Sequence, residues 1–202
     1  MKNSHPHSYA LVTFSALSAL IFSSASFIAN SAKAVENNQS KRTSETSSAP
    51  SDAQIAKIVM TINKSEVKEA EHVKDKSKNP EIQRFADHML RAHEASNDRT
   101  EKLTKNQKIK PQDSDMSRDL EQKSKQSLSE LKRQDTAQLD SAYLSAQVQE
   151  HQETLSTLNQ LLPQARNPEL KSLIRQMRPE VEGHLKEAKQ LQASLSSSSA
   201  SG

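Results

Sequence analysis

The chain has 202 residues, with 28 Lys and Arg against 25 Asp and Glu, two Gly, no Cys and only 3% aromatic residues. The lack of Cys excludes disulfides, thiolate metal ligands and Cys catalysis, and two Gly are too few for a phosphate-cradling loop. Because Lys2 and Lys33 lie in the leader segment described next, the rest of the chain is almost neutral, and the composition predicts no nucleic-acid partner.

Residues 1–34 have the parts of a secretory signal peptide. A short polar lead with Lys2 precedes an apolar run over 9–29, and Ala32-Lys33-Ala34 matches the small-x-small pattern of a cleavage site. We therefore expect a periplasmic or secreted protein. Since the apolar run is rather long, an uncleaved signal anchor is the alternative, and it is the one membrane contact that the sequence predicts. Residues 35–51 are polar, rich in Ser and Thr and without hydrophobic period, so we expect a disordered linker.

Residues 52–195 are predicted to form one all-α domain. Two tripeptides, Asn79-Pro80-Glu81 and Asn167-Pro168-Glu169, combine a good N-cap residue, Pro at the first helical position and an acid at the positive end of the helix dipole. Each therefore predicts a tight turn between two antiparallel helices. The helices expected in chain order are 52–77, 80–106, 115–132, 135–162 and 168–195, with a loop over 107–114 and a disordered tail over 196–202.

The four long helices carry narrow apolar stripes at helical spacing, such as Leu144, Val148, Leu155 and Leu158. Such helices cannot bury themselves alone, so we expect a four-helix bundle of two antiparallel hairpins, with 115–132 as a shorter connecting helix. Pro179 should kink the last helix because it lacks a backbone N–H. The two turns can lie at the same end of the bundle, or at opposite ends if the connecting helix crosses its full length.

One polar residue stands in the apolar stripe of each long helix: Glu66, His93, His151 and His184. Glu66 lies thirteen residues before Asn79 and His93 fourteen after it, while His151 and His184 lie sixteen before and seventeen after Asn167. At about 1.5 Å rise per residue, each pair sits at nearly equal height on neighbouring helices. In either topology the four side chains converge near the middle of the core.

Two interpretations of this quartet remain open. Buried imidazole and carboxylate groups need partners, and three His with one Glu can bind one transition metal ion: Zn, Fe, Mn or Cu. Alternatively, the four residues form a structural hydrogen-bonded cluster that fixes helix register. A di-iron carboxylate site is disfavoured, because the residues three before His93, His151 and His184 are Leu90, Val148 and Val181 rather than Glu.

Several short motifs, in this order and spacing, resemble a known family: Glu66-Val67, Asn79-Pro80, Phe85-Ala86, His93-Glu94-Ala95, Ala142-Tyr143, Glu150-His151, Asn167-Pro168-Glu169-Leu170 and Gly183-His184-Leu185. Together they are similar to the bacterial exported family catalogued as domain of unknown function 4142, over roughly residues 52–193. The resemblance implies a ferritin-like four-helix fold and an envelope or secreted location, and it supplies no activity.

The sequence thus favours an exported ferritin-like bundle with a mid-core Glu/His metal site and a role in metal handling or envelope stress protection. The alternative is a metal-free structural or interaction module of the cell envelope with a protein partner on its polar faces. An oxidase or peroxidase is the third reading, disfavoured by the missing carboxylates and the scarcity of aromatic residues. No catalytic residue is predicted, and the oligomeric state does not follow from the sequence.

Overall fold

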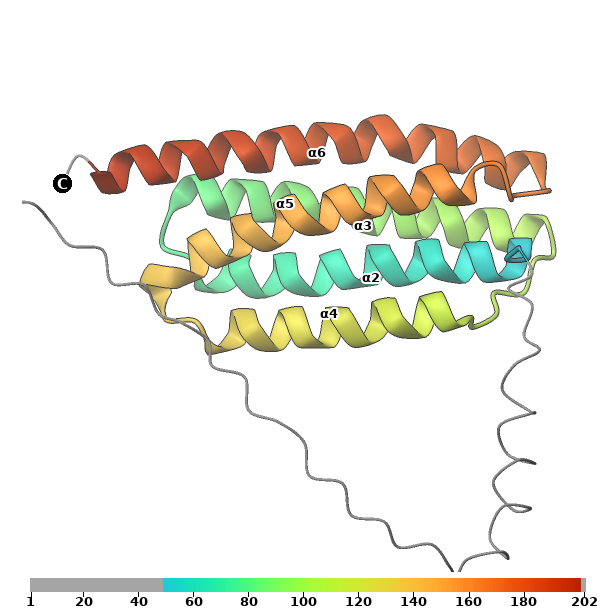
Figure 1. Cartoon of the computed structure of the whole chain (residues 1–202), viewed down its shortest axis with the longest axis horizontal. Helices are drawn as coiled ribbons and strands as arrows, with labels where there is room; N and C mark the ends of the chain where they lie inside the picture. Colours follow the sequence, from blue (N-terminus) through green and yellow to red (C-terminus); the bar gives the residue numbers. More distant parts are fainter. Residues whose placement is uncertain (1–48, 201–202) are drawn as a thin grey trace, which may run out of the picture. The chain divides into compact units, whose positions relative to one another are not determined.

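The computed structural model of the chain describes residues 49–200 (Figure 1). The predicted signal peptide, most of the predicted linker and the last two residues of the predicted tail lie outside the described residues. Within 49–200 the predicted all-α class is confirmed, with five helices and no strand. The helices are α2 (Asp52–Lys76), α3 (Pro80–Asn106), α4 (Asp115–Arg133), α5 (Thr136–Leu161) and α6 (Pro168–Ala200). None of these described helices combines the length and apolar character that crossing a membrane requires.

Both Asn-Pro-Glu tripeptides begin a helix as predicted. The Asn79 side-chain oxygen accepts a hydrogen bond from the backbone N–H of Glu81 at 2.9 Å. The Asn167 oxygen accepts from Glu169 and Leu170, at 2.9 and 3.0 Å. These bonds satisfy N–H groups that have no partner within the helix, so the local sequence sets where α3 and α6 start.

Four helices close a ring, because α2 packs on α3, α3 on α6, α6 on α5 and α5 on α2. Helix α4 lies outside this ring, against α2 and α5 (Figure 1). The α5–α6 turn meets the start of α2, where the Asp52 carboxylate accepts hydrogen bonds from the backbone N–H groups of Arg166 and Asn167 at 2.8 and 2.9 Å. The α2–α3 turn lies at the opposite end (Figure 1). Of the two arrangements left open by the sequence, the chain adopts the one with its turns at opposite ends.

Helix α6 departs from the sequence prediction at its end. It continues to Ala200, past the predicted end near Leu195, and so it occupies most of the predicted tail. In this added stretch the Ser196 Oγ donates a hydrogen bond to the Gln192 carbonyl at 2.9 Å. Pro179 lies inside α6 without interrupting it. This residue is exposed, so the site of its missing N–H faces solvent.

The core consists of two apolar clusters separated by a polar layer. One cluster contains Ile58 and Leu158, and the other contains Phe85 and Leu144. Between them α2, α3, α5 and α6 contribute buried polar residues: Asn63, Glu66, Glu69, His93, Gln147, His151 and His184. The candidate site lies in this layer.

Candidate metal centre

Three of the four predicted site residues come together in the polar layer. His93 on α3, His151 on α5 and His184 on α6 are all buried, with exposed fractions of 4, 1 and 7%. One nitrogen of each ring lies within 4.8 Å of a nitrogen of the other two. The ring centroids are 5.3 to 5.7 Å apart. Residues from both helical hairpins therefore build one compact imidazole cluster.

Neighbouring oxygen atoms orient two of the rings. The Nδ1 of His93 lies 3.1 Å from the Asn63 side-chain oxygen, and the Nδ1 of His151 lies 3.0 Å from the backbone carbonyl oxygen of Gln147. Because an oxygen of either kind only accepts, each Nδ1 carries the proton and donates. Each Nε2 then keeps its lone pair. This is how outer groups usually fix the tautomer of a metal-binding imidazole.

The nitrogens left over have no partner. The Nε2 atoms of His93 and His151 and the Nδ1 of His184 are buried and make no hydrogen bond. An unsatisfied buried polar atom is costly, and most such atoms in native proteins find a partner. Three of them, one on each ring of a single cluster, fit a metal ion as the missing partner.

The protonation state of the cluster also suits a metal. Burial lowers the pKa of His151 to about 4. Burial first, and then the neighbouring imidazoles of His151 and His88, lower the pKa of His184 to about 3. Burial first, and then the imidazoles of His151, His184 and His88, hold the pKa of His93 well below its usual value. All three rings are therefore neutral at pH 7, which is the form that binds metal.

Glu66, the fourth predicted site residue, is buried beside His151 but on another edge of the ring. Its Oε1 lies 3.7 Å from the Nδ1 of His151, and its Oε2 accepts a hydrogen bond from the Gln147 Nε2 at 2.8 Å. Burial, and secondly the nearby Glu69, raise the pKa of Glu66 to about 8. The group of side chains whose ligand atoms lie close enough to share one metal ion consists of the three His without Glu66. Direct ligation by Glu66 therefore stays a prediction.

Two orienting residues were missed by the sequence reasoning. Gln147 lies one helical turn before His151 on the same face, and Asn63 lies three residues before Glu66. Polar residues one turn before Glu66 and before His151 were the available signal, although Gln147 orients His151 through its backbone carbonyl, which a residue of any type would supply. This signal was weak because amides are common on helices, and only the three-dimensional structure shows which atom each one faces.

A surface cavity leads to the cluster from one side. It has a volume of about 440 Å³ and lies between α3 and α6, lined by residues that include His88, Gly183, His184 and Glu187. The exposed His88 has its Nδ1 3.0 Å from the Glu187 Oε2, and its ring centroid is 5.2 Å from that of His184. No heavy atom lies within 4 Å of where a Gly183 Cβ would stand, so the wall is open there. This cavity gives ions and water an approach to His184.

This donor set has a defined chemistry. Three neutral imidazoles suit Zn, Cu, Fe and Ni, with metal–nitrogen distances of about 2.0 to 2.1 Å for Zn. Three protein ligands also leave one tetrahedral position for water or another small ligand.

Comparisons with known proteins give one match. The model of the family described as "Domain of unknown function (DUF4142)" matches residues 37–191. No curated protein and no solved structure matches the chain.

Proposed function

We propose that this chain, which belongs to the DUF4142 family, binds one transition metal ion in its polar layer. Membership of the family supplies no activity, so the proposal rests on the geometry of that layer. The ligands in this proposal are the Nε2 atoms of His93 and His151 and the Nδ1 of His184. Two observations carry it: one nitrogen of each ring lies within 4.8 Å of a nitrogen of each of the other two, and each of the same three buried rings has a nitrogen without a hydrogen-bond partner. Zn²⁺ is the first candidate, because neutral imidazoles are common zinc ligands and the element needs no redox partner.

In this proposal the other polar residues position the ligands. Asn63 and the Gln147 carbonyl hold two rings in the binding tautomer, and Glu66 supports His151 from its Nδ1 edge. Supporting groups of this kind typically change metal affinity 10- to 100-fold. The chain's own residues thus bind and orient the ion, and we assign none of them a catalytic step.

The wider proposal is an exported ferritin-like four-helix bundle that handles metal or protects the cell envelope. The turns at opposite ends and the full-length crossing of α4 support the ferritin-like topology. The signal peptide predicted over residues 1–34 supports a periplasmic or secreted location. A metal-free interaction module of the envelope is the competing outcome.

The test is elemental analysis of the full chain, purified without chelator from cells that express it with its own leader. We expect about one equivalent of a single transition metal in the wild type. His93→Ala, His151→Ala and His184→Ala should each lower the content to near zero, because two imidazoles hold an ion far more weakly than three.

His88→Ala is the matched control. This residue lies beside His184 but is exposed and already pairs with Glu187, so its loss should leave the metal content unchanged. A wild type without metal, or a metal content in all three core variants that equals that of the wild type, would contradict the proposal and favour the metal-free module.

A further inference from the structure

A fourth imidazole continues the buried cluster to the protein surface. The ring centroid of His88 on α3 lies 5.2 Å from that of His184. This spacing is the same as that within the cluster, where the centroids of the three core rings are 5.3 to 5.7 Å apart. The His88 side chain is 53% exposed, whereas His184 is buried. His184 therefore connects a row of imidazoles that runs from solvent to the core.

This row borders the cavity of about 440 Å³ between α3 and α6. His88 and His184 both line the cavity, and the Nδ1 of His184 is buried on the side of the core. Arg99 is the one Lys or Arg among the lining residues, and it pairs with the Glu180 Oε2 at 2.6 Å. Because its charge is paired, the cavity lining presents no free Lys or Arg that would repel a metal ion.

Glu187 orients the exposed imidazole. The Nδ1 of His88 lies 3.0 Å from the Glu187 Oε2. Because the carboxylate accepts, the Nδ1 of the neutral ring carries the proton and its Nε2 keeps a lone pair. A carboxylate in this position is a common support of metal-binding His residues. His88 is outside the group of three rings that can share one ion, so it offers an ion a single protein ligand. One ligand holds an ion weakly, which suits a residue that passes the ion on.

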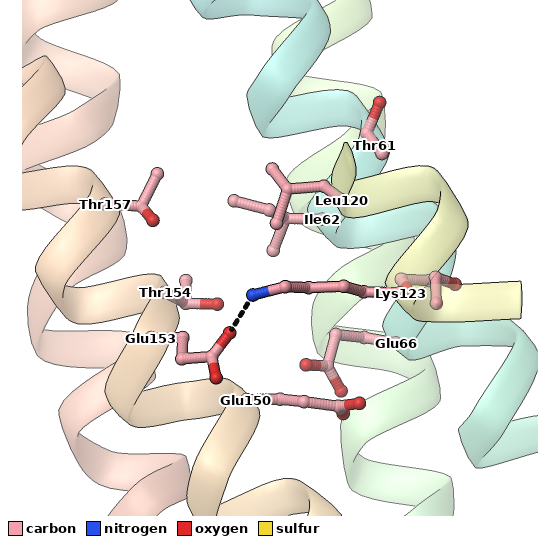
Figure 2. Close-up of a pocket in the computed structure, with 11 residues that line it drawn as sticks. Thr61, Ile62, Glu66, Leu120, Lys123, Glu150, Glu153, Thr154 and Thr157 are labelled. Atoms are coloured by element: carbon pink, nitrogen blue, oxygen red, sulfur yellow. Dashed lines mark hydrogen bonds and ion pairs between the residues drawn. The ribbon is translucent and has the colours of Figure 1, made fainter. Parts of the chain in front are cut away.

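The opposite side of the polar layer offers no comparable row. A small cavity of about 60 Å³ between α2, α4 and α5 is lined by Glu66 and Glu150 and by none of the three core His (Figure 2). Figure 2 also shows Lys123 reaching from α4 to Glu153 on α5, with which it pairs at 3.2 Å. An ion on this side would meet carboxyl groups before any imidazole. The cavity between α3 and α6 is therefore the more direct way to the cluster.

We propose that metal ions reach the imidazole cluster through the cavity between α3 and α6, with His88 as a transient first ligand that passes the ion to His184. This inference rests on the metal site proposed above and adds how that site is filled. A group that only lowers the barrier to exchange speeds uptake and release equally and leaves the equilibrium unchanged. His88 thus controls how fast the site fills and empties, and not how much metal it finally holds.

The experiment follows Co²⁺ uptake and release by the metal-free full chain in a stopped-flow spectrometer. Co²⁺ accepts imidazole ligands as Zn²⁺ does, and its bound form absorbs visible light. Excess Co²⁺ starts uptake, and excess EDTA starts release. We expect His88→Ala to slow both about tenfold, with the final absorbance of the wild type. His88→Gln should do the same, because Gln can still donate to Glu187 but has no imidazole.

Gly183 allows a steric test of the same route. It lines the cavity, and no heavy atom lies within 4 Å of where its Cβ would stand, so a larger side chain has room to begin there. Gly183→Leu should narrow the cavity and slow uptake and release about tenfold. Thr157→Leu is the matched control, because it enlarges a residue that lines the small cavity on the opposite side, and both rates should stay those of the wild type. Circular dichroism melting verifies that each variant folds.

The outcomes separate this inference from the metal site itself. A wild type that gains no Co²⁺ absorbance at equilibrium would remove the site, and the route to it as well. Full final absorbance with wild-type rates in Gly183→Leu or in either His88 variant would overturn the route and leave the metal site standing. Faster uptake in His88→Ala would make this residue a barrier and not a ligand. Slower exchange in Thr157→Leu alone would place the route on the side of α4.

Discussion

At the scale of single residues, the polar layer depends on which atom each side chain presents. The Nδ1 of His151 is hydrogen-bonded to the backbone carbonyl of Gln147, and Glu66 lies on this same side of the ring. The Nε2 on the opposite side is therefore the nitrogen that stays without a partner. The sequence predicted the three His and Glu66 at one height, because height follows from residue spacing. It could not predict the edge that each ring turns inward, because that depends on rotamers and on neighbours from other helices.

Glu69 leads to a pH prediction for the metal-free protein. Burial, together with Glu150, raises its pKa in the folded state to about 9, above the usual value of 4.5 that the unfolded chain should show. Between these values the folded protein holds a proton that the unfolded chain has released, so stability falls as pH rises. Glu69→Gln should make the decline between pH 7 and 9 shallower, by about 1 kcal/mol per pH unit.

Denaturant unfolding in excess chelator, at a series of pH values, measures this slope. Glu153→Gln is the control, because hydrogen bonds from Gln149 and Lys123 lower the pKa of Glu153 and its loss cannot flatten the decline. An unchanged slope in Glu69→Gln would mean that Glu69 is ionised in the folded protein.

At the scale of helices, the sequence predicted the features that neighbouring residues determine and did not predict those that depend on contacts between helices. The starts of α3 and α6 follow from Asn79 and Asn167, since a cap acts within one turn. The ends at which the turns lie were left open because the length of α4 suits both topologies. The end of α6 was misjudged, since the Ser-rich sequence after Leu195 has poor helix propensity yet continues the helix to Ala200.

Helix α4 should be the least protected of the five described helices. Only Ser117 and Leu131 are buried on it, whereas α2 buries residues along its whole length. Local opening costs little where few apolar contacts are lost, so the α4 amides should exchange with solvent well before those of α2 and α5. Hydrogen exchange read by mass spectrometry tests this, with α3 as an internal reference. Equal protection of α4 and α2 would show that α4 unfolds only together with the rest.

At the scale of the whole molecule, the three proposed ligands connect the two hairpins, because His93 belongs to the first and His151 and His184 to the second. An ion at this site binds the folded chain and not the separated hairpins. At free Zn²⁺ 100-fold above the dissociation constant we expect about 2.7 kcal/mol of added stability. For a chain of this size that corresponds to a rise of about 5 to 10 °C in the melting temperature.

Calorimetry with and without Zn²⁺, and again after EDTA, measures the shift. His184→Ala should melt at the same temperature in all three conditions, while His88→Ala should behave as the wild type. A wild type whose melting ignores both Zn²⁺ and EDTA would indicate a polar layer that serves structure alone.

The order of helices along the chain has a consequence for when the proposed metal site can form. His184 lies on α6, the last of the described helices in chain order, so the imidazole cluster is complete only after α6 has emerged and closed the ring. A chain threaded unfolded through a membrane would carry no finished site across with it. Its metal would then be selected by the compartment in which folding ends, and not by the ions that are abundant where translation takes place.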